Sequence, residues 1–276
     1  MNRCRSHPVG ERYVGKSASG RIVPGSILEA WIGEGNDPRD LLAIDVGVEK
    51  RSGKVCSGVI ELSTRSDRIE VFLKKYTIAK FRRIFDATMG NHRATNVWDM
   101  SWHLTEHSVP VPRPLGYFVQ RMGSDWGTST FCCELIKDCS NLNAIFLGAE
   151  VRSQRLIGEG FLEIFADGVA SMHQSGVVHG DLKWTNILVD EPSLHYWLVD
   201  LDSCAHLPEV GRDRHAARDL ARFVVSGLEN GVRRDILKPF LDRYAERQSV
   251  TTERLQSVID PWIQKLLRKK RMCGQV

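Results

Sequence analysis

The chain has 276 residues, of which 42% are hydrophobic and 26% are charged, and its formal net charge is +4. These values are typical of globular proteins and exclude a disordered chain, a collagen and a coiled coil. No run of roughly 18 or more apolar residues occurs, so we expect no membrane-spanning helix, and the first residues lack the apolar stretch of a signal peptide. The length predicts one large domain or two lobes.

The cysteines and the charge give a first indication of compartment and partners. The chain has 7 cysteines, an odd number, and none of them forms a C-x-x-C pair. This usage fits neither a disulfide framework nor a zinc ribbon, and it is typical of reduced thiols in a cytoplasmic protein. The small positive charge permits an anionic partner but does not require one.

The first half of the chain is predicted to be mostly β-structure. Residues 1–25 are polar and contain glycines, and they predict a flexible arm. Three short segments rich in β-branched residues then predict a meander of antiparallel strands. They are LLAIDVGVEK (41–50), VCSGVIELS (55–63) and RIEVFLKKY (68–76). Helical spacing of apolar residues follows over about 92–107, and PVPRP (110–114) predicts an extended connector before two further strands.

The character of the sequence changes after Asn141. Apolar residues at helical spacing predict a long amphipathic helix over 155–175, and Gly176 fits the position just past its end. Two short strands joined by a polar loop follow, and the rest of the chain is helical and more charged. The sequence therefore predicts an α+β fold with a small antiparallel β-rich N-lobe over 26–137 and a larger helical C-lobe over 138–276.

The stretch VVHGDLKWTNILVD, followed by WLVDLD, carries the candidate chemistry. Asp181 precedes Asn186 by five residues, and Asp200 follows Asn186 by 14. Phosphoryl transfer from ATP needs one carboxylate that orients the acceptor hydroxyl and takes its proton, and an amide oxygen and a second carboxylate that hold Mg²⁺. Lys183 would neutralise charge on the phosphoryl group. The alternative is a loop of turn-forming residues whose spacing arises by chance.

These residues resemble the catalytic segments of the protein-kinase-like superfamily. HGDLKWTN matches the pattern H-R/G-D-x-x-x-x-N of the catalytic loop, and Asp200 of VDLD matches the first residue of the D-F-G segment. The resemblance implies a bilobal protein-kinase-like fold that uses ATP and Mg²⁺. It also implies that Asp181 is the catalytic base and that Asn186 and Asp200 are metal ligands.

The same resemblance implies a lysine on the third strand of the N-lobe that binds the α- and β-phosphates of ATP. VFLKKY offers Lys74 and Lys75, which point to opposite faces of a strand. Lys74 shares its face with Phe72, as the lysine of the V-A-I-K pattern shares one with its alanine, so we expect Lys74 to have this role. The alternative is that both are solvated lysines of an edge strand.

Two features of the N-lobe depart from the superfamily pattern. The helix that should supply an acidic partner for the lysine has Asp99 as its only carboxylate, so either Asp99 serves from a shifted register or the pair is absent. The glycine-rich pattern G-x-G-x-x-G is also missing. Gly53 lies in the turn between the first two strands, where it either helps to bind the ATP phosphates or belongs to a simple charged hairpin.

Further segments resemble the bacterial lipopolysaccharide core kinases, which phosphorylate Kdo or heptose. HGD in place of HRD and DLD in place of DFG point away from typical protein kinases, and SVPVPRPLGY, FCCELI and RDLARF resemble segments of these enzymes. The resemblance implies that ATP is the donor and that a sugar hydroxyl of the lipopolysaccharide inner core, or of a related glycan, is the acceptor. It also implies that Glu134 and Ile136 present backbone groups to adenine. Asp219 either braces the catalytic loop or is an N-terminal helix charge.

Two basic patches fit an anionic glycolipid at the cytoplasmic face of the inner membrane, where the resemblance implies that the enzyme works. The first comprises Lys74, Lys75, Lys80, Arg82 and Arg83, and the second comprises Lys265, Arg268, Lys269, Lys270 and Arg271. The second patch lies beside Trp262 and leucines, as in a helix that binds an anionic surface. Basic tails are also often merely solvated, and regularly spaced aromatic residues for nucleic acid are lacking, so we expect no specific nucleic acid partner.

Three alternatives stay open. The first is a small atypical serine/threonine protein kinase, and the second is a pseudokinase that acts as a binding module, which the departures at Asp99 and Gly53 favour. The third concerns Trp184, which lies inside the catalytic loop and either contacts the acceptor sugar or packs in the core.

Overall fold

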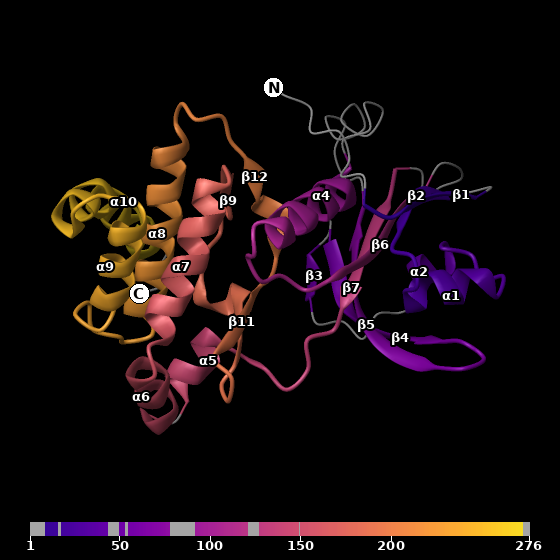
Figure 1. Cartoon of the computed structure of the whole chain (residues 1–276), viewed down its shortest axis with the longest axis horizontal. Helices are drawn as coiled ribbons and strands as arrows, with labels where there is room; N and C mark the ends of the chain where they lie inside the picture. Colours follow the sequence, from indigo (N-terminus) through magenta and orange to yellow (C-terminus); the bar gives the residue numbers. More distant parts are fainter. Residues whose placement is uncertain are drawn as a thin grey trace. The chain divides into compact units, whose positions relative to one another are not determined.

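The computed structural model describes residues 9–15, 18–43, 50–52, 55–77, 92–120, 127–148 and 150–272. The chain divides into two compact units (Figure 1). The first, called the sheet unit here, comprises Met1–His103 and Pro112–Ile136, and the second, the helical unit, comprises Leu104–Val111 and Lys137–Val276.

An antiparallel sheet of seven strands is the framework of the sheet unit, counted over its described residues. Its strands are β1 (Glu11–Val14), β2 (Ala18–Ile22), β3 (Lys50–Ser52), β4 (Val55–Ser63), β5 (Arg68–Tyr76), β6 (Pro114–Gln120) and β7 (Ser129–Glu134). Their order is β1-β2-β6-β7-β5-β4-β3. The β5 strand therefore lies between β7 and β4, inside the sheet.

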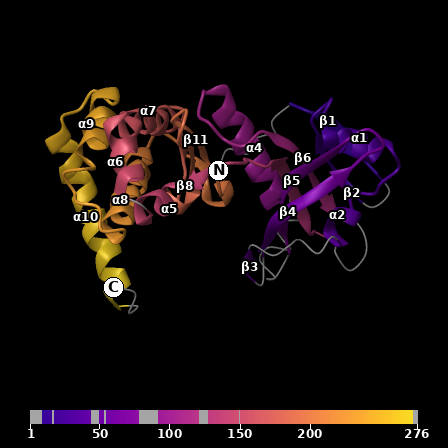
Figure 2. The ribbon, with the colours of Figure 1, turned by 90° about the horizontal axis from the view of Figure 1, so that it is seen from below.

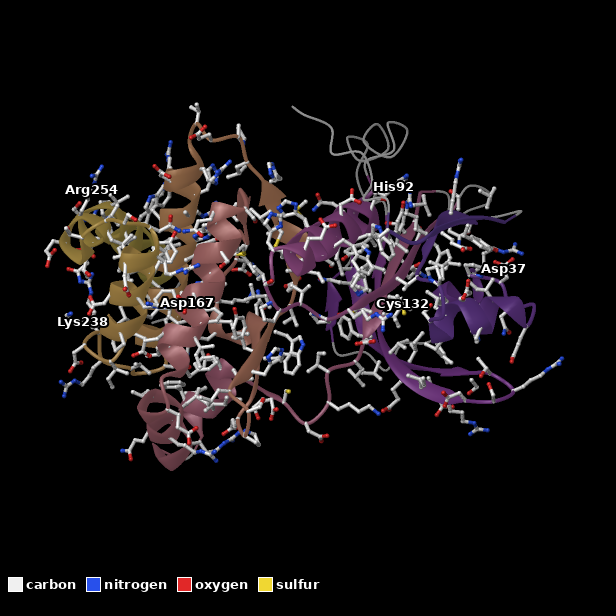
Figure 3. All side chains as sticks on the ribbon, in the orientation of Figure 1. Asp37, His92, Cys132, Asp167, Lys238 and Arg254 are labelled. Carbon is white, nitrogen blue, oxygen red and sulfur yellow. The ribbon has the colours of Figure 1, made fainter. Side chains whose placement is uncertain are left out.

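Helices cover both faces of this sheet. Helices α1 (Ile27–Gly33) and α2 (Asp40–Ala43) pack on the face to which Leu73 of β5 and Phe118 of β6 point. Cys132 of β7 belongs to this core (Figure 3). Helix α4 (Arg93–Glu106) packs on the opposite face, where the ring of its Trp98 lies 5.5 Å from that of Tyr117. Because successive strand residues point to opposite faces, Tyr117 packs against α4 whereas Phe118 packs against the layer of α1 and α2.

The prediction of a flexible arm over residues 1–25 is wrong for its second half. Residues 18–22 form β2, which pairs with β6 from Ala18 opposite Gln120 to Ile22 opposite Gly116. Ala18, Gly20 and Ile22 are buried while the two residues between them are half-buried, so the segment has the period of a strand. A Cβ at Gly20 would lie 1.8 Å from the Tyr117 carbonyl oxygen, so the close pairing needs glycine there.

The strand predicted over 41–50 is also wrong at its start. Residues 40–43 form the short helix α2, and β3 begins only at Lys50, while 44–49 lie outside the described residues. The apolar run LLAI is compatible with a buried helical turn as well as with a strand. A run this short does not distinguish a helix from a strand.

The helical unit is built on six helices within its described residues. They are α5 (Leu142–Leu147), α6 (Glu150–Gly158), α7 (Phe161–Gln174), α8 (Arg212–Glu229), α9 (Lys238–Arg247) and α10 (Thr252–Met272). Phe165 of α7, Phe223 of α8 and Phe240 of α9 form its aromatic core, with the last two rings 4.2 Å apart. Figure 1 shows α7 beside α8, and the rings of Phe165 and Phe223, 5.2 Å apart, join the two helices. Figure 2 shows the same unit from below.

The helix predicted over 155–175 is two helices. The break comes at Glu159 and Gly160, where Gly160 has a left-handed φ of 79°. The predicted end of the second helix is confirmed: α7 stops at Gln174, and Gly176 follows with a φ of 87°. Among the described residues, none of the helices is both long and apolar enough to cross a membrane.

Candidate active site

The catalytic-loop motif lies in the helical unit between short strands. Strand β9 (Val177–Val178) leads into the loop, which passes through a single 3₁₀ turn (Trp184–Asn186) into β10 (Ile187–Asp190). Strand β11 (His195–Leu198) pairs with β10, and the Val199 N–H donates to the Asn186 carbonyl at 3.0 Å. Asn186 and Asp200 are therefore held at the same end of one hairpin.

Asp181 is bound by two cations. Lys183 Nζ lies 2.6 Å from Asp181 Oδ2, and Arg222 Nε of α8 lies 3.2 Å from Asp181 Oδ1. Burial by itself raises the pKa of the Asp181 carboxyl, but the hydrogen bonds and charges of Lys183 and Arg222 outweigh it and lower that pKa below its usual value. Asp181 is thus ionised at neutral pH and oriented from both sides.

Asn186 has the geometry of an oxygen ligand. Its side chain is buried, and Nδ2 donates to the Asp181 carbonyl at 3.0 Å. This hydrogen bond fixes the orientation of the amide, with Oδ1 directed away from that carbonyl. Asp200 has a left-handed backbone (φ 62°, ψ 52°), which is uncommon for a residue with a side chain and typical of functional sites. An amide and a carboxylate oxygen at one hairpin end fit Mg²⁺, which takes its other ligands from phosphate oxygens and water.

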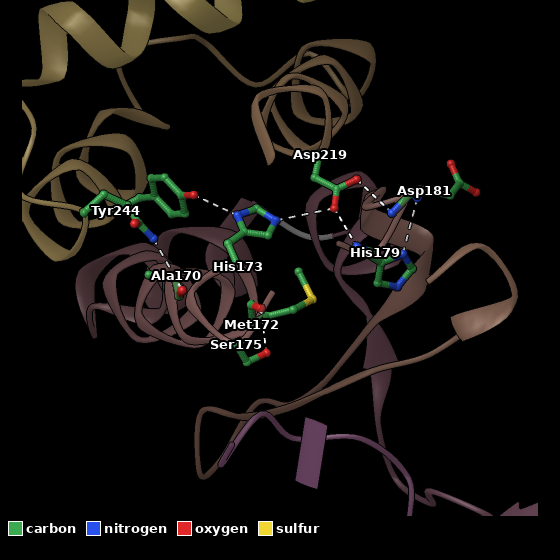
Figure 4. Close-up of polar contacts among 10 residues, drawn as sticks. Ala170, Met172, His173, Ser175, His179, Asp181, Asp219 and Tyr244 are labelled. Atoms are coloured by element: carbon green, nitrogen blue, oxygen red, sulfur yellow. Dashed lines mark hydrogen bonds and ion pairs between the residues drawn. The ribbon is translucent and has the colours of Figure 1, made fainter. Parts of the chain in front are cut away.

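Asp219 of α8 fixes the start of the loop. Its side chain is almost fully buried, at 2% exposed, and it accepts hydrogen bonds from the His179 N–H at 2.6 Å and the Gly180 N–H at 2.9 Å (Figure 4). His179 lies in turn against Val199, with Nε2 3.1 Å from the carbonyl oxygen, and its Nδ1 accepts from the Asp181 N–H. Of the two predictions for Asp219, bracing of the loop is confirmed.

Glycine in the HGD motif has a steric cause. Gly180 has a left-handed φ of 79°, and a Cβ there would lie 2.5 Å from the Ser203 carbonyl oxygen. Ser203 belongs to the 3₁₀ turn Leu201–Ser203, directly after Asp200. The close approach of the two segments therefore requires a residue without a side chain at this position.

Trp184 belongs to the core. Its side chain is fully buried, with its ring 4.6 Å from that of Phe146 on α5 and 5.7 Å from that of Phe223 on α8. The proposed contact of Trp184 with the acceptor sugar is therefore wrong. The apolar spacing around the loop gave no sign of this, because both partners come from distant parts of the chain.

In the sheet unit, Lys74 lies on β5 opposite Ser57 of β4 and Phe131 of β7. The alternative of an edge strand is wrong, because β5 has a neighbour on both sides. Lys74 Nζ lies 5.9 Å from the centre of the Tyr76 ring, which Arg93 of α4 contacts, so Lys74 points to the face that α4 covers.

Asp99 is buried on α4, where its charge adds to burial in raising the pKa of Tyr117. Both alternatives for Lys74, a pair with Asp99 or no such pair, stay predictions. Gly53, predicted to contact phosphates, lies outside the described residues.

The predicted adenine segment begins at Glu134, the last residue of β7. The Glu134 N–H donates to the Arg113 carbonyl at 2.9 Å, so Glu134 has no free N–H for adenine and its carbonyl is the remaining candidate. The backbone groups of Ile136 make no hydrogen bond within the described part of the chain. Cys133, just before Glu134, is buried, and burial outweighs the charge of Lys74 and raises the pKa of the thiol to about 12.

Arg222 is the residue that sequence reasoning missed. It follows Asp219 by three residues on α8, so the two side chains lie on the same side of that helix. The RDLARF segment contained this signal: once Asp219 is placed against the loop, the arginine one turn later faces the same loop. The contact with Asp181 depends on how α8 packs, which spacing alone does not give.

Comparisons with known proteins find relatives among lipopolysaccharide kinases. The profile of the lipopolysaccharide kinase (Kdo/WaaP) family matches residues 48–244, more than half of the chain. The 3-deoxy-D-manno-octulosonic acid kinase of Photobacterium damsela subsp. piscicida is 30% identical over 131 residues, which cover 47% of this chain and 52% of that protein. The kinase of the same name from Vibrio vulnificus (strain CMCP6) is 31% identical over 133 residues, with 48% and 52% covered. The chain spans about half the length of the curated relatives that it matches.

A solved structure of WaaP in complex with acyl carrier protein shares the fold. It covers 86% of this chain and 94% of its own, with a TM-score of 0.61 and 19% sequence identity. The predicted α+β protein-kinase-like fold is confirmed by this likeness and by the antiparallel sheet and the helices described above.

Proposed function

Since the chain belongs to the lipopolysaccharide kinase (Kdo/WaaP) family, we propose that it transfers the γ-phosphate of ATP to a sugar hydroxyl of the lipopolysaccharide inner core, with 3-deoxy-D-manno-octulosonic acid (Kdo) as the acceptor sugar. The observation that carries this proposal is the ionised carboxylate of Asp181, held between Lys183 and Arg222. A carboxylate so oriented suits a base that receives the proton of an acceptor hydroxyl.

The reaction follows from the charges in the loop. The acceptor oxygen attacks the γ-phosphorus, its proton passes to Asp181, and the bond from the γ-phosphorus to the β–γ bridging oxygen breaks to release ADP. Lys183, already 2.6 Å from Asp181, neutralises negative charge that develops on the phosphoryl oxygens. Asn186 and Asp200 would hold Mg²⁺, which would supply further charge neutralisation at the phosphates.

Binding of ATP is assigned to the sheet unit. Lys74 binds the α- and β-phosphates, while the Glu134 carbonyl and the Ile136 backbone bind adenine. The position of Lys74 inside the sheet and the unused backbone groups of Ile136 support these roles.

The experiment is transfer of labelled γ-phosphate from Mg-ATP to a Kdo-bearing lipid A acceptor, with a generic protein substrate offered in parallel. We expect label on the glycolipid, and a loss of at least about a hundredfold in rate for Asp181→Asn. Asp213→Asn, at an exposed position in the first turn of α8, is the matched control and should keep the wild-type rate. Label on the protein alone would favour a serine/threonine protein kinase, and nucleotide binding without any transfer would favour a pseudokinase.

We further propose that the protein is cytoplasmic and contacts the anionic membrane that holds its substrate. Lys265, Arg268 and Lys269 are exposed on α10, and Trp262 of the same helix has the Arg214 guanidinium 5.4 Å and the Lys265 ammonium 5.0 Å from its ring centre. Each such cation near an anionic surface contributes about 1 kcal/mol of binding free energy. The side chains of Lys270 and Arg271, and all of residues 80–83 of the other predicted patch, lie outside the described residues.

Sedimentation with phosphatidylglycerol vesicles tests the membrane contact. The wild-type protein should sediment with these vesicles at low salt, and the triple variant Lys265→Gln, Arg268→Gln, Lys269→Gln should remain largely in the supernatant. Equal sedimentation of both proteins would contradict a role for α10.

A further inference from the structure

Arg222 is a half-buried arginine at the candidate catalytic base, with a side chain 22% exposed. Among the described residues, its Nε alone is engaged, at 3.2 Å from Asp181 Oδ1. The other carboxylate oxygen of Asp181 is bound by Lys183 at 2.6 Å. Two positive charges thus contact the single carboxylate of Asp181.

The far end of the Arg222 side chain remains available. A guanidinium has five N–H donors, and the four on the two Nη atoms of Arg222 have no partner within the part of the chain that the structure describes. Arg243 in the same unit differs, because its Nε and both Nη atoms bind Asp167 and Glu246. Arg222 is thus held in place by α8, while its Nη atoms remain available. Such an arginine is suited to bind a ligand.

The geometry of that end selects the ligand chemistry. Paired N–H groups of a guanidinium match the two oxygens of a carboxylate, and such bidentate contacts are stronger and more directional than those of an ammonium. The acceptor named in the proposed function is a sugar acid, so it carries a carboxylate on the ring that is phosphorylated. An anchor for this group beside Asp181 would place the sugar, and with it the reacting hydroxyl, at the base.

We propose that Arg222 binds the carboxylate of the acceptor sugar through its Nη atoms and makes the enzyme specific for an acidic sugar. This inference rests on the proposed function. It adds a specificity-determining residue outside the motifs H-G-D-x-x-x-x-N and D-L-D, and it explains why an arginine lies one helical turn after the loop-bracing Asp219.

The test compares two acceptors, a Kdo-bearing lipid A and the same molecule with the Kdo carboxyl group converted to a primary amide. The wild-type protein should prefer the carboxylate by roughly 10- to 100-fold in kcat/KM, because a charge-assisted pair is lost with the amide. Arg222→Gln should reduce this preference to about twofold or less, mainly by losing activity on the carboxylate. Arg222→Lys keeps the charge without the planar end and should show an intermediate preference.

Controls separate this role from others. Arg218→Gln, at an exposed position one turn earlier on α8, should keep the full preference, and thermal shift with Mg-ATP should show that all variants are folded. If Arg222→Gln lowers activity on both acceptors equally, Arg222 only orients Asp181 and the inference is wrong. Equal kcat/KM of the wild-type protein on the two acceptors would also overturn it. Wild-type transfer to neither acceptor would refute the proposed function itself, and the inference with it.

Discussion

The Oδ2 atom of Asp219 lies 2.6 Å from the backbone nitrogen of His179, forty residues earlier in the chain. The same carboxylate accepts from the Gly180 N–H at 2.9 Å, so two consecutive backbone groups of the catalytic loop end on one buried side chain of α8. His173 of α7 lies 3.5 Å from it and contacts the Tyr244 hydroxyl at 2.8 Å. The position of Asp181 therefore depends on a polar contact inside the helical core.

Asp219→Ala should unfold more easily than the wild-type protein. It leaves the buried His179 N–H and the half-buried Gly180 N–H without an acceptor, and the expected loss is about 2–4 kcal/mol in the free energy of unfolding. Thermal or urea unfolding measures this loss, and transferase activity should fall with it because the loop is no longer fixed. Asp213→Ala, exposed on the same helix, is the control, and equal stability of the two variants would contradict the bracing role.

Gly180→Ala and Gly211→Ala form a matched pair. Both glycines have left-handed φ angles, 79° and 88°, so an alanine at either costs roughly 1–2 kcal/mol of backbone strain. Only Gly180 lies against another segment, with Ser203 in the way of a Cβ, whereas nothing lies within 4 Å of a Cβ at Gly211. We expect Gly180→Ala to lose far more activity and stability than Gly211→Ala. Similar melting temperatures and rates would show that the Ser203 contact has no importance.

Lys183→Gln should move the acid limb of the pH–activity profile to higher pH. Burial alone raises the pKa of Asp181, and Lys183 is the main group that lowers it, so removing Lys183 lets that pKa rise. Activity that needs ionised Asp181 is lost as pH falls through this pKa. The contribution of these ion pairs to stability has the same sign. It is fully present above the ordinary carboxyl pKa of 3.8 that Asp181 has in the unfolded chain, and it is lost as pH falls through the lower pKa of the folded protein.

The measurement is kcat/KM for phosphate transfer between about pH 3 and 8, a range that reaches below the ordinary carboxyl pKa. Lys238→Gln is the control, because its ion pair with Asp242 lies on the surface of α9. An unchanged acid limb in Lys183→Gln would show that Asp181 does not set it.

Asp200→Asn and Asp200→Ala separate charge from backbone conformation. Asparagine tolerates the left-handed φ of 62° at this position, so Asp200→Asn should unfold at nearly the wild-type temperature yet lose at least about a hundredfold in Mg-ATP-dependent rate. Asp200→Ala should lose the same activity and also about 1 kcal/mol of stability. Wild-type activity in Asp200→Asn at saturating Mg²⁺ would argue against a metal ligand here.

The sequence predicted those parts of the site that depend on local chain. Asp181, Asn186 and Asp200 lie in one loop and one hairpin, so their spacing alone indicated how they group, and the family match confirms the resemblance based on them. Three other features could not be predicted from local spacing: the helices on both faces of the sheet, the break at Gly160 and the burial of Trp184. Each depends on packing between segments far apart in the chain.

Arg222 and the β2 strand show the same difference. Both carried a readable pattern, helical spacing from Asp219 in one case and strand alternation in the other. Neither pattern identifies its partner, which is Asp181 for Arg222 and β6 for β2. Tertiary contact, and not local preference, decides such positions.

The hairpin of β10 and β11 has a consequence for the order in which the site forms during folding. Closing so short a loop costs little chain entropy, and local contacts form early, whereas the contact of Asp219 with His179 must close a loop of forty residues. We therefore expect a refolding chain to form the hairpin end with Asn186 before α8 fixes the loop of Asp181. Pulsed hydrogen exchange should then find the Val199 N–H protected earlier than the His179 N–H, and the reverse order would contradict this sequence of events.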